Sequence, residues 1–260
     1  MPEGNMNSDK TEETRLFWNR VADDWNTQVG DAGDSNRILN SDPVLWKFAG
    51  DVTGLTVLDA GCGTGYLSRK LHERGARVLG IDFSEKMIAI ARAKASGIDF
   101  RVDSCSDLAT VNDGSIDVII ANYVLMDTPD LDGCLRSFSR VLKTSGTVIV
   151  IFSHPCFPAG RATATPDASG VQYLWSSSYF EQRKCVDPPW GHFTSEFIWF
   201  HRPLSDYWKA FKAAGFDVLD FEEPRLTEDR YHLARNKREL HNGRSRPFSV
   251  AFKLRKKGHS

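Results

Sequence analysis

The chain has 260 residues, of which 41% are hydrophobic, so it can bury a substantial core as one domain with additions. Its formal net charge of −1 gives no general attraction to nucleic acid or to membranes, and no apolar run reaches the length of a membrane span. The five cysteines include no C-x-x-C pair, which argues against a metal site and for reduced thiols, so we expect a cytoplasmic protein.

The N-terminal segment divides into a polar lead and an amphipathic helix. Residues 1–13 are polar and predict a flexible N-terminus. From Glu13 to Thr27, apolar residues recur at helical spacing and include Trp18 and Trp25. These rings can simply seal the helix onto the rest of the fold, or they can face a ligand.

Residues 57–65 read Val-Leu-Asp-Ala-Gly-Cys-Gly-Thr-Gly, a buried strand that runs into a glycine-rich turn and then a helix. Gly61, Gly63 and Gly65 allow the backbone to turn sharply and to approach a ligand at the helix N-terminus. The third glycine comes one place early for a dinucleotide site, and Asp59 would repel a pyrophosphate but hold an ammonium group. S-adenosylmethionine, with a nucleoside at one end and an amino acid at the other, fits both facts.

Three further strands are expected to end beside this turn. The strand at 76–81 ends in Asp82, about twenty residues beyond the turn, where a carboxylate can accept hydrogen bonds from ribose hydroxyls. Its alternative role, capping the next helix, suits Ser84 better. A third strand spans 100–102, and a fourth, at 116–121, ends at Asn122 and Tyr123. Ligands bind beyond the carboxyl ends of such strands, although Tyr123 can equally belong to the core.

The second half of the chain begins with a turn at Ser145 and Gly146 and a fifth strand at 147–152. Nine aromatic residues between positions 173 and 200 are too many for a solvated loop, so they must pack on the sheet, on each other or around a ligand. We expect a lid that faces the ligand, with a hairpin over the core as the alternative. A helix at 206–214 and two antiparallel strands should follow, separated by a basic polar run at 225–246.

These motifs resemble, in the same order, those of the class I S-adenosylmethionine-dependent methyltransferases, and in particular small-molecule enzymes of the methyltransferase domain 11/25 type. The matching segments are 57–65, 78–82, 116–122 and 141–150, and the resemblance covers roughly residues 15–153. It implies a Rossmann-like, doubly wound α/β fold with a mostly parallel seven-stranded sheet and an antiparallel edge strand. The implied parts are an N-terminal helical lid at 14–50, a cofactor-binding core at 51–152, an acceptor-side insertion at 153–203, and a C-terminal helix with edge strands at 204–260.

The resemblance also implies which residues hold the cofactor, S-adenosylmethionine, and which contact the methyl acceptor. Asp103 is expected beside the adenine, although it can equally cap a local turn. The implied cofactor-binding residues are Asp59, Gly61, Gly63, Gly65, Asp82, Phe83, Met87, Asp103, Ser104, Asn122 and Tyr123. The implied acceptor-binding residues are Trp18, Trp25, Tyr179, His192, Trp199 and His201.

His154 is the strongest candidate for a general base, because it follows the fifth strand at the ligand-binding edge of the sheet. Its alternative role is to order the turn that contains Pro155 and Pro158. We expect methyl transfer to an oxygen or nitrogen of a small molecule, without membrane partners. The alternatives are an RNA methyltransferase that uses the run at 225–246, a cofactor-binding protein without turnover, and a nicotinamide dehydrogenase.

Overall fold

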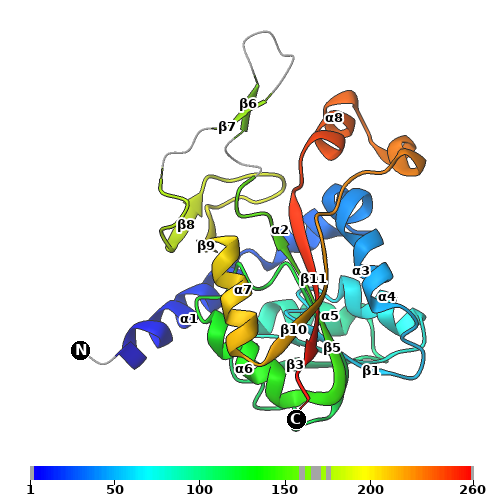
Figure 1. The fold of residues 1–260 in the computed structure, drawn as a ribbon, viewed down its shortest axis with the longest axis vertical. Helices are drawn as coiled ribbons and strands as arrows, with labels where there is room; N and C mark the ends of the chain where they lie inside the picture. The colour runs from blue at the N-terminus through cyan, green and yellow to red at the C-terminus, as the bar shows by residue number, and fades with distance from the viewer. Residues whose placement is uncertain (1–2, 158–161, 165–170, 174–176, 259–260) are drawn as a thin grey trace.

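A seven-stranded sheet in the order β10-β11-β5-β4-β1-β2-β3 forms the centre of the computed structural model, which describes residues 3–157, 162–164, 171–173 and 177–258 (Figure 1). β11 pairs antiparallel with both β5 and β10, and all other neighbours in the sheet are parallel. The predicted fold is confirmed, with the reversed strand one place in from the edge. The strands are β1 (Thr56–Ala60), β2 (Arg77–Asp82), β3 (Asp99–Val102), β4 (Ile116–Asn122), β5 (Leu142–Ser153), β10 (Phe216–Glu222) and β11 (Ser249–Lys256).

Helices cover both faces of this sheet, because its central strands are apolar on both sides. In β4, Ile119 packs into one core cluster and Ile120 into the other, and both side chains are fully buried. The Ile119 cluster includes residues of α6 (Leu131–Val141) and α7 (Leu204–Ala213). The Ile120 cluster includes residues of α3 (Asp42–Ala49), α4 (Tyr66–Glu73) and α5 (Glu85–Lys94). This double layer leaves the carboxyl ends of the parallel strands as the edge at which a ligand can bind.

The N-terminal segment is more helical than its sequence predicts. α1 (Glu3–Arg20) includes most of the lead that was predicted to be flexible, and α2 (Ala22–Val29) follows it after a break at Val21. Polar residues do not exclude a helix when they pair along its surface, as Glu12 and Arg15 do at 2.7 Å. A π-helix, η1 (Arg37–Ser41), lies between α2 and α3.

The described residues of the insertion after β5 include two small antiparallel pairs of strands. β6 (Ala162–Ala164) pairs with β7 (Val171–Tyr173), and this pair projects away from the sheet (Figure 1). β8 (Arg183–Asp187) pairs with β9 (Phe197–His201) closer to the core. β5 itself begins at Leu142, so the turn predicted at Ser145 and Gly146 is wrong because these residues continue the strand.

The basic run near the C-terminus folds into two short helices, η3 (Glu228–Leu233), which is a 3₁₀-helix, and α8 (Lys237–Ser245). The amide of Leu226 donates to the carbonyl of Gly243 at 2.9 Å, and the guanidinium of Arg230 donates to the carbonyl of Ile38. The run is therefore partly used in contacts within the chain, which tie it to η1. Within the described ranges, no helix combines the length and the apolar character needed to cross a membrane.

Candidate active site

A cavity enclosing about 640 Å³, part of it open to solvent, lies at the carboxyl ends of β1, β2 and β4. In α/β sheets, small molecules and cofactors bind preferentially at this edge. Ten residues predicted from the sequence line it together, although they come from segments far apart in the chain. They are Trp18, Trp25, Gly61, Gly63, Asp82, Phe83, Met87, Ser104, Asn122 and Tyr123.

The glycine turn after β1 needs its glycines for two reasons. Gly61 and Gly63 have φ angles of 71° and 51°, in the left-handed region that side chains disfavour. A Cβ atom added at Gly63 would also lie 2.9 Å from Nε1 of Trp25, and one added at Gly61 would meet the side chain of Val124 at 2.5 Å. The backbone therefore forms part of the cavity floor directly. Gly65, the third glycine, caps α4 with a φ of 78° and packs against Phe100 instead of the cavity.

Asp82 connects the second strand to this turn. Its Oδ2 accepts a hydrogen bond from the amide of Gly63 at 3.0 Å, and its Oδ1 accepts one from the amide of Ser84 at 2.9 Å. Burial raises the pKa of Asp82 to about 6, and the hydrogen bonds from the backbone amides of Ser84 and Gly63 oppose that rise. Ser84 caps α5, as predicted, by accepting from the amide of Met87. Each carboxylate oxygen of Asp82 retains a lone pair for a ligand.

Asp59 lies behind the turn and does not line the cavity. Its Oδ2 accepts a hydrogen bond from Oγ of Ser68 at 2.6 Å. Burial, with a smaller effect from the negative charge of Asp82, raises the pKa of Asp59 to about 7. The predicted contact between Asp59 and an ammonium group therefore stays a prediction, and the observed partner of its carboxyl group is a hydroxyl.

At the end of β4, Tyr123 has a φ of 59°, unusual for a residue with a side chain. Its hydroxyl contacts Nδ2 of Asn36 at 2.5 Å and Oγ of Ser249 at 2.6 Å. The guanidinium of Arg37 lies 4.9 Å from the Tyr123 ring centre and 5.1 Å from that of Trp25. Sequence reasoning missed Arg37, because only the fold brings η1, α2 and β4 together.

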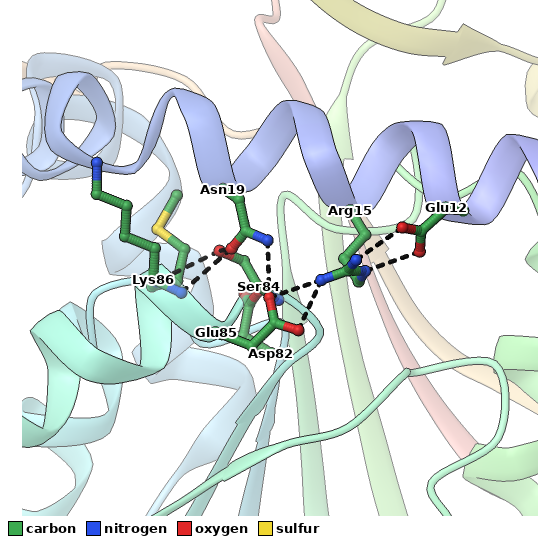
Figure 2. A network of polar contacts seen from close by, with 8 residues as sticks. Glu12, Arg15, Asn19, Asp82, Ser84, Glu85 and Lys86 are labelled. Carbon is green, nitrogen blue, oxygen red and sulfur yellow. Dashed lines mark hydrogen bonds and ion pairs between the residues drawn. The ribbon is translucent and has the colours of Figure 1, made fainter.

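Helix α1 is tied to the turn that carries Asp82 (Figure 2). Oδ1 of Asn19 accepts hydrogen bonds from Oγ of Ser84 at 2.7 Å and from the amide of Lys86 at 3.2 Å. The Glu85 carboxylate accepts hydrogen bonds from two side chains of α1, from Nδ2 of Asn19 and from Nη1 of Arg15. Since Trp18 lies on the same helix and lines the cavity, these contacts hold α1 in place as one wall of the site.

Asp103 takes the alternative role considered from the sequence. Its carboxylate accepts hydrogen bonds from the amides of Ser104, Ala109 and Thr110 and from the hydroxyl of Thr110. These contacts close the local turn after β3, and Asp103 does not line the cavity. The next residue, Ser104, does line it. The predicted contact of Asp103 with adenine stays untested.

The aromatic insertion packs mainly on the N-terminal helices. The ring of Phe197 makes edge-to-face contacts with the rings of Phe17 and Trp18, with 5.6 Å between ring centres in each pair. The ring centres of Phe193 and Trp25 are 6.1 Å apart. Since Trp18 and Trp25 line the cavity, the insertion supports this wall from behind. Trp175, another of the nine aromatic residues, lies outside the described residues.

The four acceptor-binding residues predicted in the insertion do not line the cavity. Nε2 of His201 contacts the carbonyl of Tyr179 at 2.8 Å, and the Tyr179 hydroxyl accepts from the amide of Leu204. Nε1 of Trp199 donates to Asp187 across the β8–β9 hairpin at 2.7 Å. The amide of His192 donates to the side chain of Gln28 at 3.1 Å. The role of these residues toward an acceptor stays a prediction.

His154 is buried, and it does not line the cavity. Its Nδ1 accepts a hydrogen bond from the amide of Cys156 at 3.0 Å, which places the proton of the neutral ring on Nε2. Nε2 contacts Oε1 of Glu223 at 2.9 Å. Burial lowers the pKa of His154, and Glu223 opposes that effect. The amide contact matches the turn-ordering alternative, and the catalytic role stays a prediction.

Sequence reasoning missed five residues that line the cavity: Thr11, Cys105, Val124, Asp127 and Thr128. Three of them lie in the loop between β4 and α6. The fourth strand was predicted to end at the site, and these three residues follow it directly. This position is the one signal in the sequence that could have identified them.

The comparisons with known proteins agree with this geometry. A sequence model described as a methyltransferase domain matches residues 51–170. The demethylmenaquinone methyltransferase of Lactococcus lactis is 29% identical over 231 residues, which are 81% of this chain and 87% of that enzyme. This chain belongs to the class I S-adenosylmethionine-dependent methyltransferases.

Other relatives of this methyltransferase cover different shares of the chain. The ubiquinone biosynthesis O-methyltransferase of Xanthomonas oryzae is 35% identical over 142 residues, which are 53% of this chain and 59% of that enzyme. The crystal structure of an S-adenosylmethionine dependent methyltransferase from Mesorhizobium loti matches with a TM-score of 0.69 and 24% identity, over 82% of this chain and 96% of that one. The cofactor of this methyltransferase is S-adenosylmethionine.

Proposed function

We propose that this methyltransferase transfers a methyl group from S-adenosylmethionine to an oxygen or nitrogen atom of a small-molecule acceptor. The single observation that carries the proposal is the buried Asp82 carboxylate, held against the glycine turn in the wall of the cavity. The names of the Lactococcus and Xanthomonas relatives support a small acceptor, and that of the Xanthomonas enzyme supports transfer to oxygen.

The residues of the cavity fit this cofactor. The floor is bare backbone at Gly61 and Gly63, where an added Cβ would meet Val124 or Trp25. Oδ1 of Asn122 is buried, lines the cavity and has no hydrogen-bond partner among the described residues. Buried polar atoms of this kind normally have a partner, so they indicate a ligand that carries hydrogen-bond donors.

Each part of the cofactor has residues suited to it. Asp82 would accept hydrogen bonds from the ribose hydroxyls, and the glycine turn would receive the amino-acid end. Phe83, Met87 and Ser104 would enclose the adenine, with apolar surface from the first two. Arg37 is paired with Asp34 at 2.7 Å and contacts the rings of Trp25 and Tyr123, which line the cavity, so its guanidinium would lie near the cofactor carboxylate.

The cofactor supplies an activated methyl group on a positively charged sulfur, so the protein chiefly has to align an acceptor and exclude water. Trp18 and Trp25 close the cavity on the side of α1 and α2, and the rings of Phe193 and Phe197 hold them in place. The ties from Asn19 and Arg15 fix this wall to the turn that carries Asp82 (Figure 2).

Calorimetry with S-adenosylhomocysteine, and separately with NAD, tests the cofactor part of this proposal. We expect the protein to bind S-adenosylhomocysteine and not to bind NAD. Formation of S-adenosylhomocysteine from S-adenosylmethionine and a metabolite library then identifies the acceptor, and NMR of the product identifies the methylated atom. A methyl group found on carbon or sulfur would refute transfer to oxygen or nitrogen.

A further inference from the structure

The loop after β4 places a carboxyl group in the cavity that the cofactor contacts described above do not use. Asp127 is 7% exposed, and its Oδ1 has no hydrogen-bond partner among the described residues. Asn122, at the start of the same segment, presents a second buried acceptor atom without a partner. The other two buried acids of this region differ, because Asp59 and Asp82 both accept hydrogen bonds from the protein.

The loop that carries Asp127 is held firmly by the insertion. The guanidinium of Arg202, which follows β9, donates to the carbonyls of Leu125, Thr128 and Pro129 at 3.1, 2.7 and 3.1 Å. The amide of Phe200, within β9, donates to the carbonyl of Met126 at 2.8 Å. The backbone on both sides of Asp127 is therefore fixed, which keeps this residue at the cavity wall.

The electrostatic setting of Asp127 favours uptake of a proton. Burial raises its pKa well above the usual range, and the positive charge of Arg37 only partly opposes this effect. A carboxylate with raised proton affinity is a better base toward a weakly acidic hydroxyl or amine than an exposed carboxylate is. In its ionised form, the Asp127 carboxylate would repel an acceptor that is itself a carboxylate.

We propose that Asp127 binds the methyl acceptor through an O–H or N–H group of that acceptor and takes up its proton. The inference rests on the proposed function. As a lone pair of the acceptor oxygen or nitrogen forms its bond to the methyl carbon, the bond from that carbon to sulfur breaks and its electron pair stays on sulfur. The proton of the acceptor passes to Asp127 and then to solvent. The acceptor class is thus a phenol, alcohol or amine that bears a proton, and not a tertiary amine or a carboxylate.

The test compares Asp127→Asn, which keeps the shape but loses the base, with Asp132→Asn as a matched control on an exposed position of α6. The probes are catechol, 2-aminophenol and 1,4-naphthohydroquinone, with benzoate and N,N-dimethylaniline as acceptors outside the proposed class. Binding of each probe to the complex with S-adenosylhomocysteine is followed by NMR, and turnover by formation of S-adenosylhomocysteine.

We expect Asp127→Asn to lower kcat by about a hundredfold or more with a smaller change in KM, and to leave the affinity for S-adenosylhomocysteine within about twofold. Asp132→Asn should match the wild type. Wild-type kcat/KM in Asp127→Asn would overturn the proposal, as would a wild-type enzyme that binds none of the three proton-bearing probes or prefers benzoate or N,N-dimethylaniline. Failure of the wild type to bind S-adenosylhomocysteine would instead refute the proposed function.

Thermal unfolding separates this effect from a loss of fold. If Asp127→Asn unfolds at a much lower temperature than the wild type, Asp127→Ser serves as the second variant, because its smaller side chain leaves room for water. Folded Asp127→Ser with full turnover would likewise overturn the assignment.

Discussion

Oδ2 of Asp82 and the backbone amide of Gly63 are joined by a hydrogen bond of 3.0 Å, which ties the end of β2 to the glycine turn after β1. One carboxylate therefore both shapes the turn and lines the cavity beside it. Under the proposed function, residue 82 should therefore affect both ends of the cofactor, the sugar directly and the amino-acid end through the turn.

Replacement of Asp82 by alanine removes two accepting oxygens and the tie to Gly63. We expect Asp82→Ala to lower the affinity for S-adenosylhomocysteine by at least about tenfold, because hydrogen bonds to a buried charged group are strong. Isothermal titration calorimetry measures this effect. Asp107→Ala, at an exposed position of the loop after β3, is the matched control. Unchanged affinity in Asp82→Ala would exclude the ribose role.

Binding should also depend on pH through Asp82. The pKa of its carboxyl group is raised to about 6, and only the ionised form accepts hydrogen bonds on both oxygens. Affinity for S-adenosylhomocysteine should therefore be constant above about pH 7 and fall as the pH drops below about 6. In Asp82→Asn this part of the pH dependence should disappear. An identical pH profile in the wild type and Asp82→Asn would contradict the assignment.

Asp59 links the stability of the ligand-free protein to pH. Its pKa is raised from 3.8 to about 7, so between these values the folded state holds a proton that the unfolded chain releases. The stabilisation from that proton is complete below about pH 4 and is lost as the pH rises through about 7. Asp59→Asn should therefore be more stable than the wild type at pH 8, by roughly 1–3 kcal/mol, and show little or no gain at pH 4. Urea unfolding at both pH values measures the difference, and an equal effect at both would contradict the raised pKa.

Arg37 should act on the amino-acid end of the cofactor. Arg37→Met keeps the apolar stem between Trp25 and Tyr123 but removes the positive charge. We expect Arg37→Met to lower the affinity for S-adenosylhomocysteine by about tenfold or more. The affinity for 5′-methylthioadenosine, which lacks the amino-acid end, should be nearly unchanged. Arg74→Met is the matched control, because Arg74 lies 3.7 Å from the ring centre of Trp46, which does not line the cavity, whereas Trp25 and Tyr123 do. Equal weakening of both ligands by Arg37→Met would indicate a structural effect instead.

His154→Ala distinguishes the two roles considered for this residue. Its contacts with Cys156 and Glu223 lead us to expect a lower unfolding temperature, by a few degrees, and unchanged kcat per folded molecule. Differential scanning calorimetry and turnover measure the two quantities. A large fall in kcat with normal affinity for S-adenosylhomocysteine would establish the catalytic role that the sequence predicted.

The sequence alone determined the sheet, the glycine turn, the capping of α5 by Ser84 and the positions of Asp82 and Asn122. These features depend on local patterns, namely apolar runs of strand length, glycines at fixed offsets and a polar residue at the end of a strand. Since the carboxyl ends of parallel strands meet at one edge, the predicted strand ends were sufficient to identify most of the residues that line the cavity.

Only the tertiary structure decided which side chains outside the strand ends reach the cavity. Arg37 contacts the rings of Trp25 and Tyr123 in the cavity wall, and Arg202 lies far along the chain from the loop that it holds beside Asp127. The aromatic residues Phe193 and Phe197 of the insertion pack on Trp25 and Trp18, because aromatic rings buried against one another stabilise the fold. Such contacts between distant segments depend on loop conformation and packing, for which neither hydrophobic periodicity nor local spacing carries a signal.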